Sequence, residues 1–196
     1  MEKINFIKTF IPQGDFREKY EHGGMMVRHL AAVLDEKMGA YECYECTVPI
    51  GEYNEGEIQK AFVEFSAKMD ALNLKQAKAD KIAEITAYDT SSSVNGFMLN
   101  GLLVWLDKAT RVGLMNSTTI AKAAGQKTTT LWLGGIKLVV DCDKAIQLLS
   151  ALEMYALECF NVTASHKQAV SELTTIEEVE AYDYKAGYPK MLDMSV

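Results

Sequence analysis

The first 50 residues place apolar and polar side chains at the short period typical of β-strands. Residues 4–10 alternate loosely, and residues 41–50 are rich in Tyr, Cys, Thr and Val. Residues 25–34 are ambiguous, because their apolar positions fit a helix while the Met-Met-Val run at their start suits a strand. We therefore predict strands over 4–10 and 41–50, separated by a turn-rich stretch, and leave 25–34 open between the two.

From Asn54 onward the apolar spacing lengthens to that of a helix, with one stripe that spans about four turns. The stripe consists of Ile58, Ala61, Phe62, Phe65 and Met69. The lysine- and alanine-rich stretch 73–81 favours a helical connector rather than a loop. We place the boundary in this connector, which predicts an N-terminal α/β part over 1–75 and a C-terminal domain over 76–196.

Residues 97–106 carry a strong hairpin signal. Asn100 and Gly101 separate two apolar runs, and a type I′ turn needs positive φ at both of its central positions. Asp107 is suited to cap a helix over 109–120, and Gly125 is suited to end it. The pattern predicts a hairpin that leads directly into a helix.

The same order recurs in residues 131–140, which surround a Gly-Gly turn. Asp141 or Asp143 is expected to cap the next helix, over 143–161. This segment is the predicted central core helix because its apolar face is broad. That face consists of Ile146, Leu149, Leu152, Tyr155, Ala156 and Phe160.

Three further elements are expected near the C-terminus. Thr163 is expected to start a new helix, and Thr175 to cap a short one whose first turn is acidic. After Pro189 the chain is expected to form an extended tail.

Together these elements predict an α+β fold. A small N-terminal α/β part precedes two hairpin-plus-helix units, and the two hairpins are expected side by side in one antiparallel sheet with helices on one face. Trp105 and Trp132 lie in the hairpins, and we expect them to be buried together in the core or at a subunit interface. A ligand pocket lined by both, with Phe97, Tyr155 and Phe160, is the less favoured alternative.

The net charge of the chain limits the classes of binding partner that we expect. The net charge is −7, and acidic residues outnumber basic ones both in 1–75 and in 76–196, so no basic surface is predicted for nucleic acid. The N-terminal residues lack an apolar signal segment, and the uncharged stretch 94–106 is too short to span a membrane. We expect synthesis in the cytoplasm, with four cysteines that form no disulfide framework.

Cys43 and Cys46 form a C-x-x-C pair inside a predicted strand. Positions i and i+3 of a strand face opposite sides, which separates the two thiols. A structural zinc site would need a second ligand pair, and the sequence has none at similar spacing. We favour two ordinary strand cysteines over a redox pair or a metal site.

The remaining candidates are weaker. His22, His29 and His166 lack metal-binding spacing; a site joining the first two with Asp15 is an alternative to turn or surface positions, and His166 is expected in a solvated first helical turn. The stretch 123–129 lacks the first glycine of a phosphate loop.

The acidic run 172–183 favours a solvated face over a calcium or docking surface. We therefore predict no catalytic, cofactor or metal residues and no enzyme.

Many short segments between residues 78 and 192 share one family pattern. They are Lys81–Ile85, Ala87–Thr90, Val94–Phe97, Trp105–Arg111, Thr130–Trp132, Leu152–Ala156, Asn161–His166, Glu178–Asp183 and Ala186–Pro189. In these segments the chain resembles an uncharacterised domain family, a domain of unknown function, found in phages and in prophages of gut bacteria. Residues 1–75 lie outside the resemblance.

Relatives in that family tend to be associated with tail-fibre or other tail proteins. The resemblance implies a bacteriophage structural protein of the virion that docks onto other tail proteins and forms a homo-oligomer, and it supplies no catalytic residues. Residues 1–75 are the expected attachment part. A non-virion assembly chaperone for a tail fibre is the alternative. An enzyme would need a pocket that gathers His22, His29 or the cysteines with acids.

Overall fold

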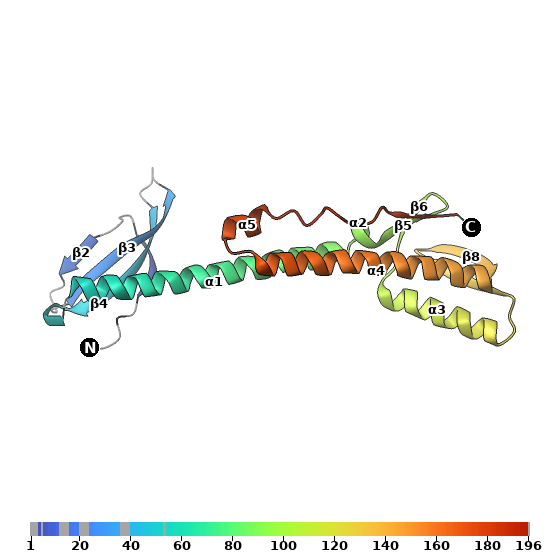
Figure 1. Ribbon diagram of the computed structural model, residues 1–196, viewed down its shortest axis with the longest axis horizontal. Helices are drawn as coiled ribbons and strands as arrows, with labels where there is room; N and C mark the ends of the chain where they lie inside the picture. The colour runs from blue at the N-terminus through green and yellow to red at the C-terminus, as the bar shows by residue number, and fades with distance from the viewer. Residues whose placement is uncertain are drawn as a thin grey trace. The chain divides into compact units, whose positions relative to one another are not determined.

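The computed structural model describes residues 4, 6–11, 16–19, 24–35, 40–52 and 54–195. The chain forms two compact units, Met1–Asn73 and Leu74–Val196. Helix α1 (Glu55–Asp89) contributes its first half to one unit and its second half to the other (Figure 1). The helical connector expected over 73–81 is confirmed as part of this helix.

The N-terminal unit is built on a four-stranded antiparallel sheet in the order β1-β4-β3-β2. Its elements are β1 (Ile7–Ile11), β2 (Phe16–Lys19), β3 (Gly24–Asp35), β4 (Ala40–Pro49) and the short 3-10 helix η1 (Ile50–Glu52). The two predicted strands are confirmed. The ambiguous stretch 25–34 is strand, because β3 pairs with β4 along most of its length and gains a ladder that an isolated helix would not offer.

The apolar stripe of α1 covers one face of this sheet. Ile58 is buried among side chains of the sheet, and the ring of Phe62 stacks on His29 with centroids 3.9 Å apart. The buried partners from the sheet side are Phe6, Val27, Tyr44, Cys46 and Val48. The predicted helical stripe is therefore confirmed as the core of this unit.

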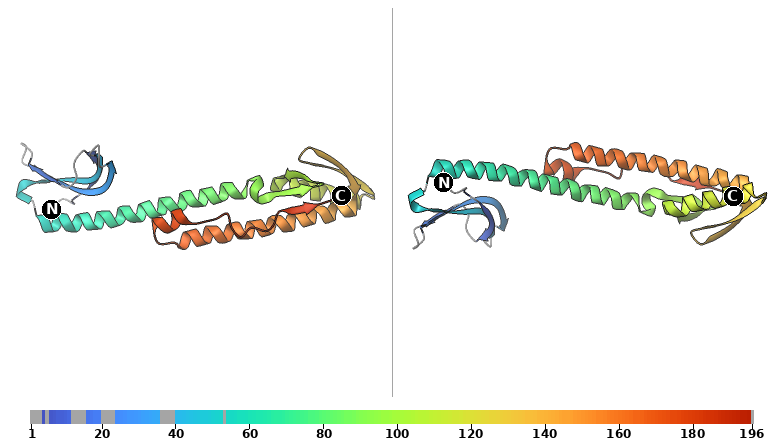
Figure 2. Two further views of the ribbon diagram at one scale, coloured as in Figure 1. Left: turned by 90° about the horizontal axis from the view of Figure 1, so that it is seen from above. Right: turned by 90° about the horizontal axis from the view of Figure 1, so that it is seen from below.

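In the C-terminal unit the second half of α1 lies beside α4 (Cys142–Glu172), and α5 (Ile176–Ala181) closes over both (Figure 2). Ile85, Val170 and Val179 meet in the buried centre of this contact. The predicted cap of α5 is confirmed: Thr175 and Glu178 form a reciprocal capping box.

Two hairpins with left-handed turns follow, as predicted. Asn100 and Gly101 have φ of 51° and 78°, and Gly134 and Gly135 have φ of 57° and 88°. The elements are α2 (Ser92–Asn95), β5 (Gly96–Leu99), β6 (Leu102–Trp105), α3 (Lys108–Ala123), β7 (Thr128–Leu133) and β8 (Ile136–Asp141).

Both predicted caps are present. Asp107 caps α3 and Asp141, rather than Asp143, caps α4. Gly125, with φ of 85°, follows the end of α3 as expected.

The α+β class is confirmed, but the two hairpins do not share one sheet. The first belongs to a three-stranded sheet, β6-β5-β9, in which β9 (Leu192–Met194) runs parallel to β5; the second is a separate two-stranded ribbon. The expected extended tail pairs with the outer edge of β5, and the second hairpin does not pair with the open edge of β6. The turn of the ribbon instead packs on β6, where a Cβ on Gly134 would lie 3.0 Å from Val104 Cγ1.

The predicted helix start at Thr163 is wrong, because α4 is continuous. Thr163 is 2% exposed, and its hydroxyl donates to Asp89 Oδ1 at 2.8 Å and lies 2.9 Å from the hydroxyl of Tyr188. A threonine that is satisfied by tertiary partners does not need to interrupt a helix. His166, which was expected to be solvated, bonds the hydroxyl of Tyr182 and the carbonyl of Ala186, each at 2.9 Å.

The prediction that the tryptophans are buried together in the core is also wrong, whereas their burial at a subunit interface stays a prediction. Trp105 is 40% exposed and Trp132 is 59% exposed. The inward strand positions are taken by other residues, because side chains alternate between the two faces of a strand. The buried core joins α4, the predicted core helix, to the hairpins through Phe97, Leu99, Val104, Leu131, Leu133, Leu149 and Leu152.

Candidate functional site

The cysteine pair has the arrangement expected of ordinary strand residues. Cys46 packs in the core beside Tyr44 and Val48, at alternate positions of β4, whereas Cys43 occupies the other parity of the strand. Both thiols are buried. Burial raises the pKa of Cys46 to about 11, which keeps it a protonated, unreactive thiol at neutral pH.

The structure describes two of the three histidines, and these two belong to different units. His29 lies in the N-terminal unit and His166 in the C-terminal unit, and His22 and Asp15 lie outside the described residues. Because a carbonyl only accepts, His166 donates from Nε2 to Ala186 and receives the hydroxyl proton of Tyr182 at Nδ1. In residues 54–195 and the described parts before them, no three His, Cys, Asp or Glu side chains are grouped to hold a metal.

The C-terminal unit instead presents a surface groove of about 420 Å³ where the end of β6, the start of α3, the α1–α2 junction and the middle of α4 meet. We call this the α3–α4 groove. It is lined by Asp89, Thr90, Asn95, Trp105, Leu106, Asp107, Lys108, Arg111, Glu153, Ala156, Leu157 and Phe160. The volume lies in the range of ordinary small-molecule pockets.

One part of the groove lining is apolar and accessible to solvent. Leu157 and Phe160 lie three residues apart, and therefore on one face of α4, and they are 49% and 60% exposed. Trp105 contributes its ring from the last position of β6. Large side chains with this exposure are candidates for contact with a ligand or partner.

The other part is organised by Arg111, which is 8% exposed. Its Nε donates to Glu153 Oε1 at 2.8 Å, and its Nη1 donates to the carbonyl of Leu106 at 2.8 Å. The guanidinium thus connects α3, α4 and the end of β6. Within the described part of the chain, its Nη2 has no hydrogen-bond partner, so donors remain for a molecule in the groove.

The carboxylates at the rim are each held in place. Asp107 accepts from the backbone N–H of Thr110 at 2.9 Å and from its hydroxyl at 2.6 Å. These bonds, the hydroxyl first, hold the pKa of Asp107 below its ordinary value. Asp89 accepts from Thr163, and Asn95 donates to the backbone carbonyl of Asp89 at 2.5 Å.

The groove was only partly anticipated. Trp105 and Phe160 were named as possible pocket residues together with Phe97 and Tyr155, but the structure places the last two in the core. The Tyr155 hydroxyl donates to the carbonyl of Val94 at 2.6 Å, and burial raises its pKa to about 12. The pair Arg111 and Glu153 was missed, since its members lie 42 residues apart and only the packing of α3 on α4 joins them.

Fold and groove together define a two-unit α+β protein whose C-terminal unit sets two hairpins on a long helix pair. Residues 76–186 match the family described as a domain of unknown function, DUF4376. Because the match spans more than half of the chain, the protein belongs to this family.

The other comparisons add no relatives. No curated protein and no solved structure matches the chain significantly. Among the helices in the described part of the chain, none combines the length and apolar character needed to cross a membrane.

Proposed function

We propose that this chain is a bacteriophage structural protein, associated with the tail or tail fibre, that acts by docking onto other virion proteins and onto copies of itself. The family relationship and the resemblance to phage tail-associated domains are the reasons for proposing a place in the phage tail. The observation that supports docking is the β7–β8 ribbon. In this proposal the N-terminal unit carries the attachment to a specific partner, and no residue has a catalytic role.

The outer face of the ribbon is apolar and uncovered. Trp132 and Val139 are 59% and 63% exposed. Thr130 pairs with Val139 and Trp132 with Lys137, so the two exposed apolar side chains are diagonal neighbours on one face. A solvent-exposed Trp–Val pair on a sheet face is the kind of anchor that protein interfaces bury.

The ribbon also offers backbone groups to a partner. Among the strands that the structure describes, β7 and β8 pair only with each other, so each has an open edge. Two-stranded ribbons are marginal alone and are strengthened by a further strand. Both views of Figure 2 place this ribbon at the periphery of the C-terminal unit, and open strand edges of this kind are where another chain can add a strand.

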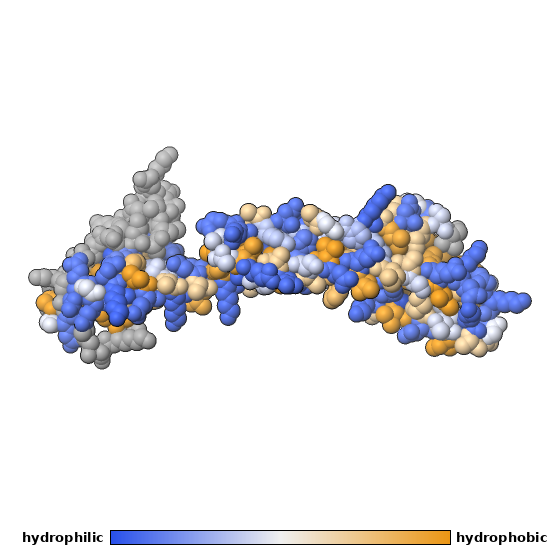
Figure 3. Space-filling view, viewed as in Figure 1, coloured by the Kyte–Doolittle hydropathy of each residue, from blue (hydrophilic) through white to orange (hydrophobic). Residues whose placement is uncertain are grey.

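A second apolar edge lies in the first hairpin. Leu102 and Leu103 of β6 are 58% and 57% exposed, and β6 is an edge strand of its sheet. Figure 3 shows further hydrophobic residues at the surface around α3 and the adjoining end of α4, interspersed with hydrophilic ones. Several separate apolar patches favour a protein that contacts more than one neighbour.

Light scattering coupled to size-exclusion chromatography tests the docking proposal. The purified chain is expected to be oligomeric, and Trp132→Ser is expected to weaken self-association by about thirtyfold, as for a hot-spot residue worth ~2 kcal/mol. Ile120→Ser is the comparison variant: Ile120 is 68% exposed and lies on α3, so an equal loss in this variant would assign self-association to the apolar surface around α3 rather than to the ribbon. A wild-type chain that is monomeric and copurifies with no virion protein would contradict the proposal.

Mass spectrometry of purified phage particles separates the virion role from that of an assembly chaperone. A structural protein is retained in finished particles at a fixed ratio to the tail proteins. A chaperone is present in the lysate and absent from the particles.

A further inference from the structure

We propose that the α3–α4 groove binds a neutral saccharide. An apolar face of the sugar ring would lie against the aromatic side chains Trp105 and Phe160, and the hydroxyls would bond the polar side chains around Arg111. The site is separate from the ribbon face on which docking is proposed, so either proposal can fail alone.

The groove combines two kinds of surface in one cavity. Trp105, Leu157 and Phe160 give it exposed apolar walls. Arg111 and Glu153 place a charged hydrogen-bonding pair beside those walls. A ligand that fills the groove must therefore be apolar on one side and rich in hydrogen-bonding groups on the other.

Charge makes an anion a poor ligand. Three carboxylates and two cations line the groove, so its formal net charge is −1. The Arg111 guanidinium is already paired with Glu153 at 2.8 Å, which neutralises the group that would otherwise attract phosphate. Phosphorylated or otherwise acidic ligands are thus disfavoured relative to neutral ones.

A metal cation is disfavoured for a different reason. Each of the three carboxylates already accepts a hydrogen bond from the protein, which leaves at most one oxygen each on Asp89 and Glu153: Asp89 accepts from Thr163, Asp107 from Thr110 and Glu153 from Arg111. In the portion of the chain that is described, no three His, Cys, Asp or Glu side chains, these carboxylates included, are grouped so that they could hold a metal ion. A hard divalent cation would need several uncommitted oxygens at one point.

A wholly apolar ligand would displace water from Arg111 without replacing its hydrogen bonds. The Nη2 group has no partner in the described portion of the protein, so covering it with hydrocarbon leaves donors unpaired. Lipid chains are thereby disfavoured, although the walls alone would suit them.

An extended peptide finds few backbone partners here. Most lining residues belong to α1, α3 and α4, whose backbone N–H and C=O groups beyond the first and last turns are bonded within the helices, and only Trp105 of the lining belongs to a strand. Recognition of an extended chain normally uses a free strand edge. A peptide in the groove would leave its own backbone groups to water, whereas a sugar brings hydroxyls that side chains can satisfy.

Sugar hydroxyls match the remaining capacity of the lining. Each hydroxyl both donates and accepts. Arg111 Nη2 offers donors, and Asp89 Oδ2 and Glu153 Oε2 can accept, because the bonds from Thr163 and Arg111 go to Oδ1 of Asp89 and Oε1 of Glu153. Planar, held-in-place groups of this kind lose little entropy on binding.

The two tryptophans permit a direct test. In the full-length Trp132→Phe variant, Trp105 is the only tryptophan and reports on the groove. We expect saturable fluorescence changes with glucose, galactose, N-acetylglucosamine or their disaccharides, with a Kd on the order of 1 mM. Saturation-transfer NMR on the wild-type chain with the same sugars provides a second measurement that does not depend on a substitution.

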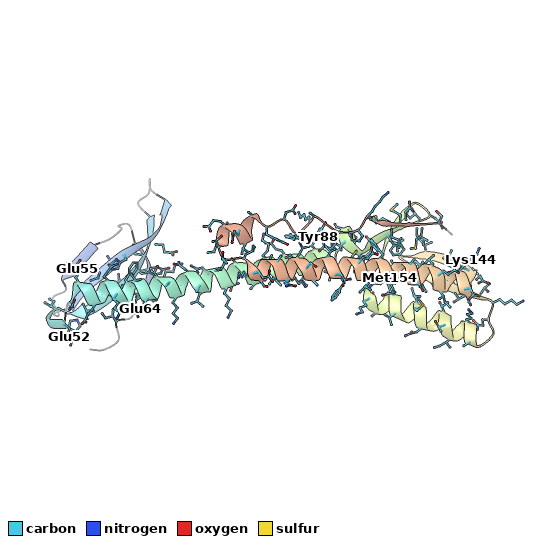
Figure 4. All side chains as sticks on the ribbon, viewed as in Figure 1. Glu52, Glu55, Glu64, Tyr88, Lys144 and Met154 are labelled. Carbon is cyan, nitrogen blue, oxygen red and sulfur yellow. The ribbon has the colours of Figure 1, made fainter. Side chains whose placement is uncertain are left out.

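Matched variants locate the binding site. Phe160→Ala is expected to weaken binding at least ~tenfold, as is Trp105→Ala in the NMR assay, because each removes an aromatic contact. Met154→Ala is the control for Phe160: Met154 lies on the same helix, is 59% exposed, and does not line the groove (Figure 4). Trp132→Ala is the control for Trp105.

Three results would overturn the saccharide proposal. The first is no saturable response to any of these sugars up to about 50 mM, well above the expected Kd. The second is binding that Trp105→Ala and Phe160→Ala leave unchanged. The third is a Trp105 signal that depends on protein concentration and not on sugar, which assigns the groove to contact with a second copy. Loss of self-association in Trp132→Ser bears on docking and leaves these outcomes unaffected.

Discussion

The two hairpin-plus-helix units of the C-terminal domain follow the same local pattern and end in different surroundings. In the first, β5 and β6 gain a third strand, and the residues that follow the hairpin bond across to α4 through Arg111 and Glu153. In the second, β7 and β8 remain a ribbon whose outer face carries exposed Trp132. Equivalent local sequence thus builds a groove in one unit and an open face in the other.

The two hairpins also differ in what one glycine of each contacts. Gly96, at the start of β5, lies so close to α2 that a Cβ there would be 2.2 Å from the backbone oxygen of Ser92. Gly134, in the second turn, meets only the side chain of Val104. The first hairpin is anchored by backbone contact, and the second rests on a side chain that can adjust.

The largest expected effect therefore comes from Gly96→Ala. The added methyl group meets backbone, so the α2–β5 junction must move, and we expect a loss of about 3 kcal/mol or more in unfolding free energy. Gly134→Ala should cost less, ~1–2 kcal/mol, from positive φ and a contact with a flexible side chain. Urea unfolding of both variants measures the difference. Equal losses would show that the first hairpin is not the more tightly anchored.

The next effect concerns Arg111 in the first hairpin-plus-helix unit, where the loss of its hydrogen bonds can be separated from the loss of its charge. Arg111→Met removes the bonds to Glu153 and to the carbonyl of Leu106, and we expect a loss of about 2–3 kcal/mol, reduced because Glu153 is partly exposed. Arg111→Lys keeps the charge and loses the fork geometry, so it should recover only part. Thermal unfolding followed by circular dichroism tests the pair, and full recovery in the lysine variant would contradict a bridging role.

Much of the local structure was predictable because local rules decide it. Turn chemistry at Asn100–Gly101, the caps Asp107 and Asp141, and the capping box at Thr175 all follow from residue type and spacing. The stripe of α1 was equally legible. For the turns and caps the interacting atoms are at most a few residues apart, and the stripe repeats within one short window although its partners lie in the sheet.

What was not predictable depends on long-range packing. The third strand beside β5 comes from Leu192–Met194, almost a hundred residues later, and it completes a sheet that the second hairpin does not join. Thr163 resembles a helix start until Asp89 and Tyr188 satisfy its hydroxyl. The α3–α4 groove needs residues from four segments, so no local window contains its pattern.

Two buried threonines allow α3 and α4, the helices of the two hairpin-plus-helix units, to be compared directly. Thr163 of α4 has tertiary partners, whereas Thr118 of α3 is 0% exposed and its hydroxyl has no hydrogen-bond partner among the residues described. We expect Thr163→Val to cost about 1–2 kcal/mol and Thr118→Val to be neutral or to stabilise by ~0.5–1 kcal/mol. The decisive result is that Thr163→Val lowers the unfolding free energy and Thr118→Val does not. A loss in both variants would mean that the hydroxyl of Thr118 has a hydrogen-bond partner in solution.

The smallest expected effect concerns Asp107, the residue that caps α3 in the first hairpin-plus-helix unit, and the dependence of this cap on pH. Hydrogen bonds from the Thr110 hydroxyl, and then from its backbone N–H, hold the pKa of Asp107 below its ordinary value of 3.8. A carboxyl whose pKa is lowered by folding contributes stability that is present above its unfolded pKa and is lost as pH falls through its folded pKa.

The stability difference between wild type and Asp107→Asn should therefore shrink on acidification below about pH 4, because the asparagine cap does not titrate. Thr110→Val removes the first cause of the shift, so the pKa of Asp107 should return toward 3.8 and the loss should begin at higher pH. NMR titration of the Asp107 carboxyl in wild type and in Thr110→Val measures this directly. An identical pKa in both proteins would show that the hydroxyl does not hold the cap.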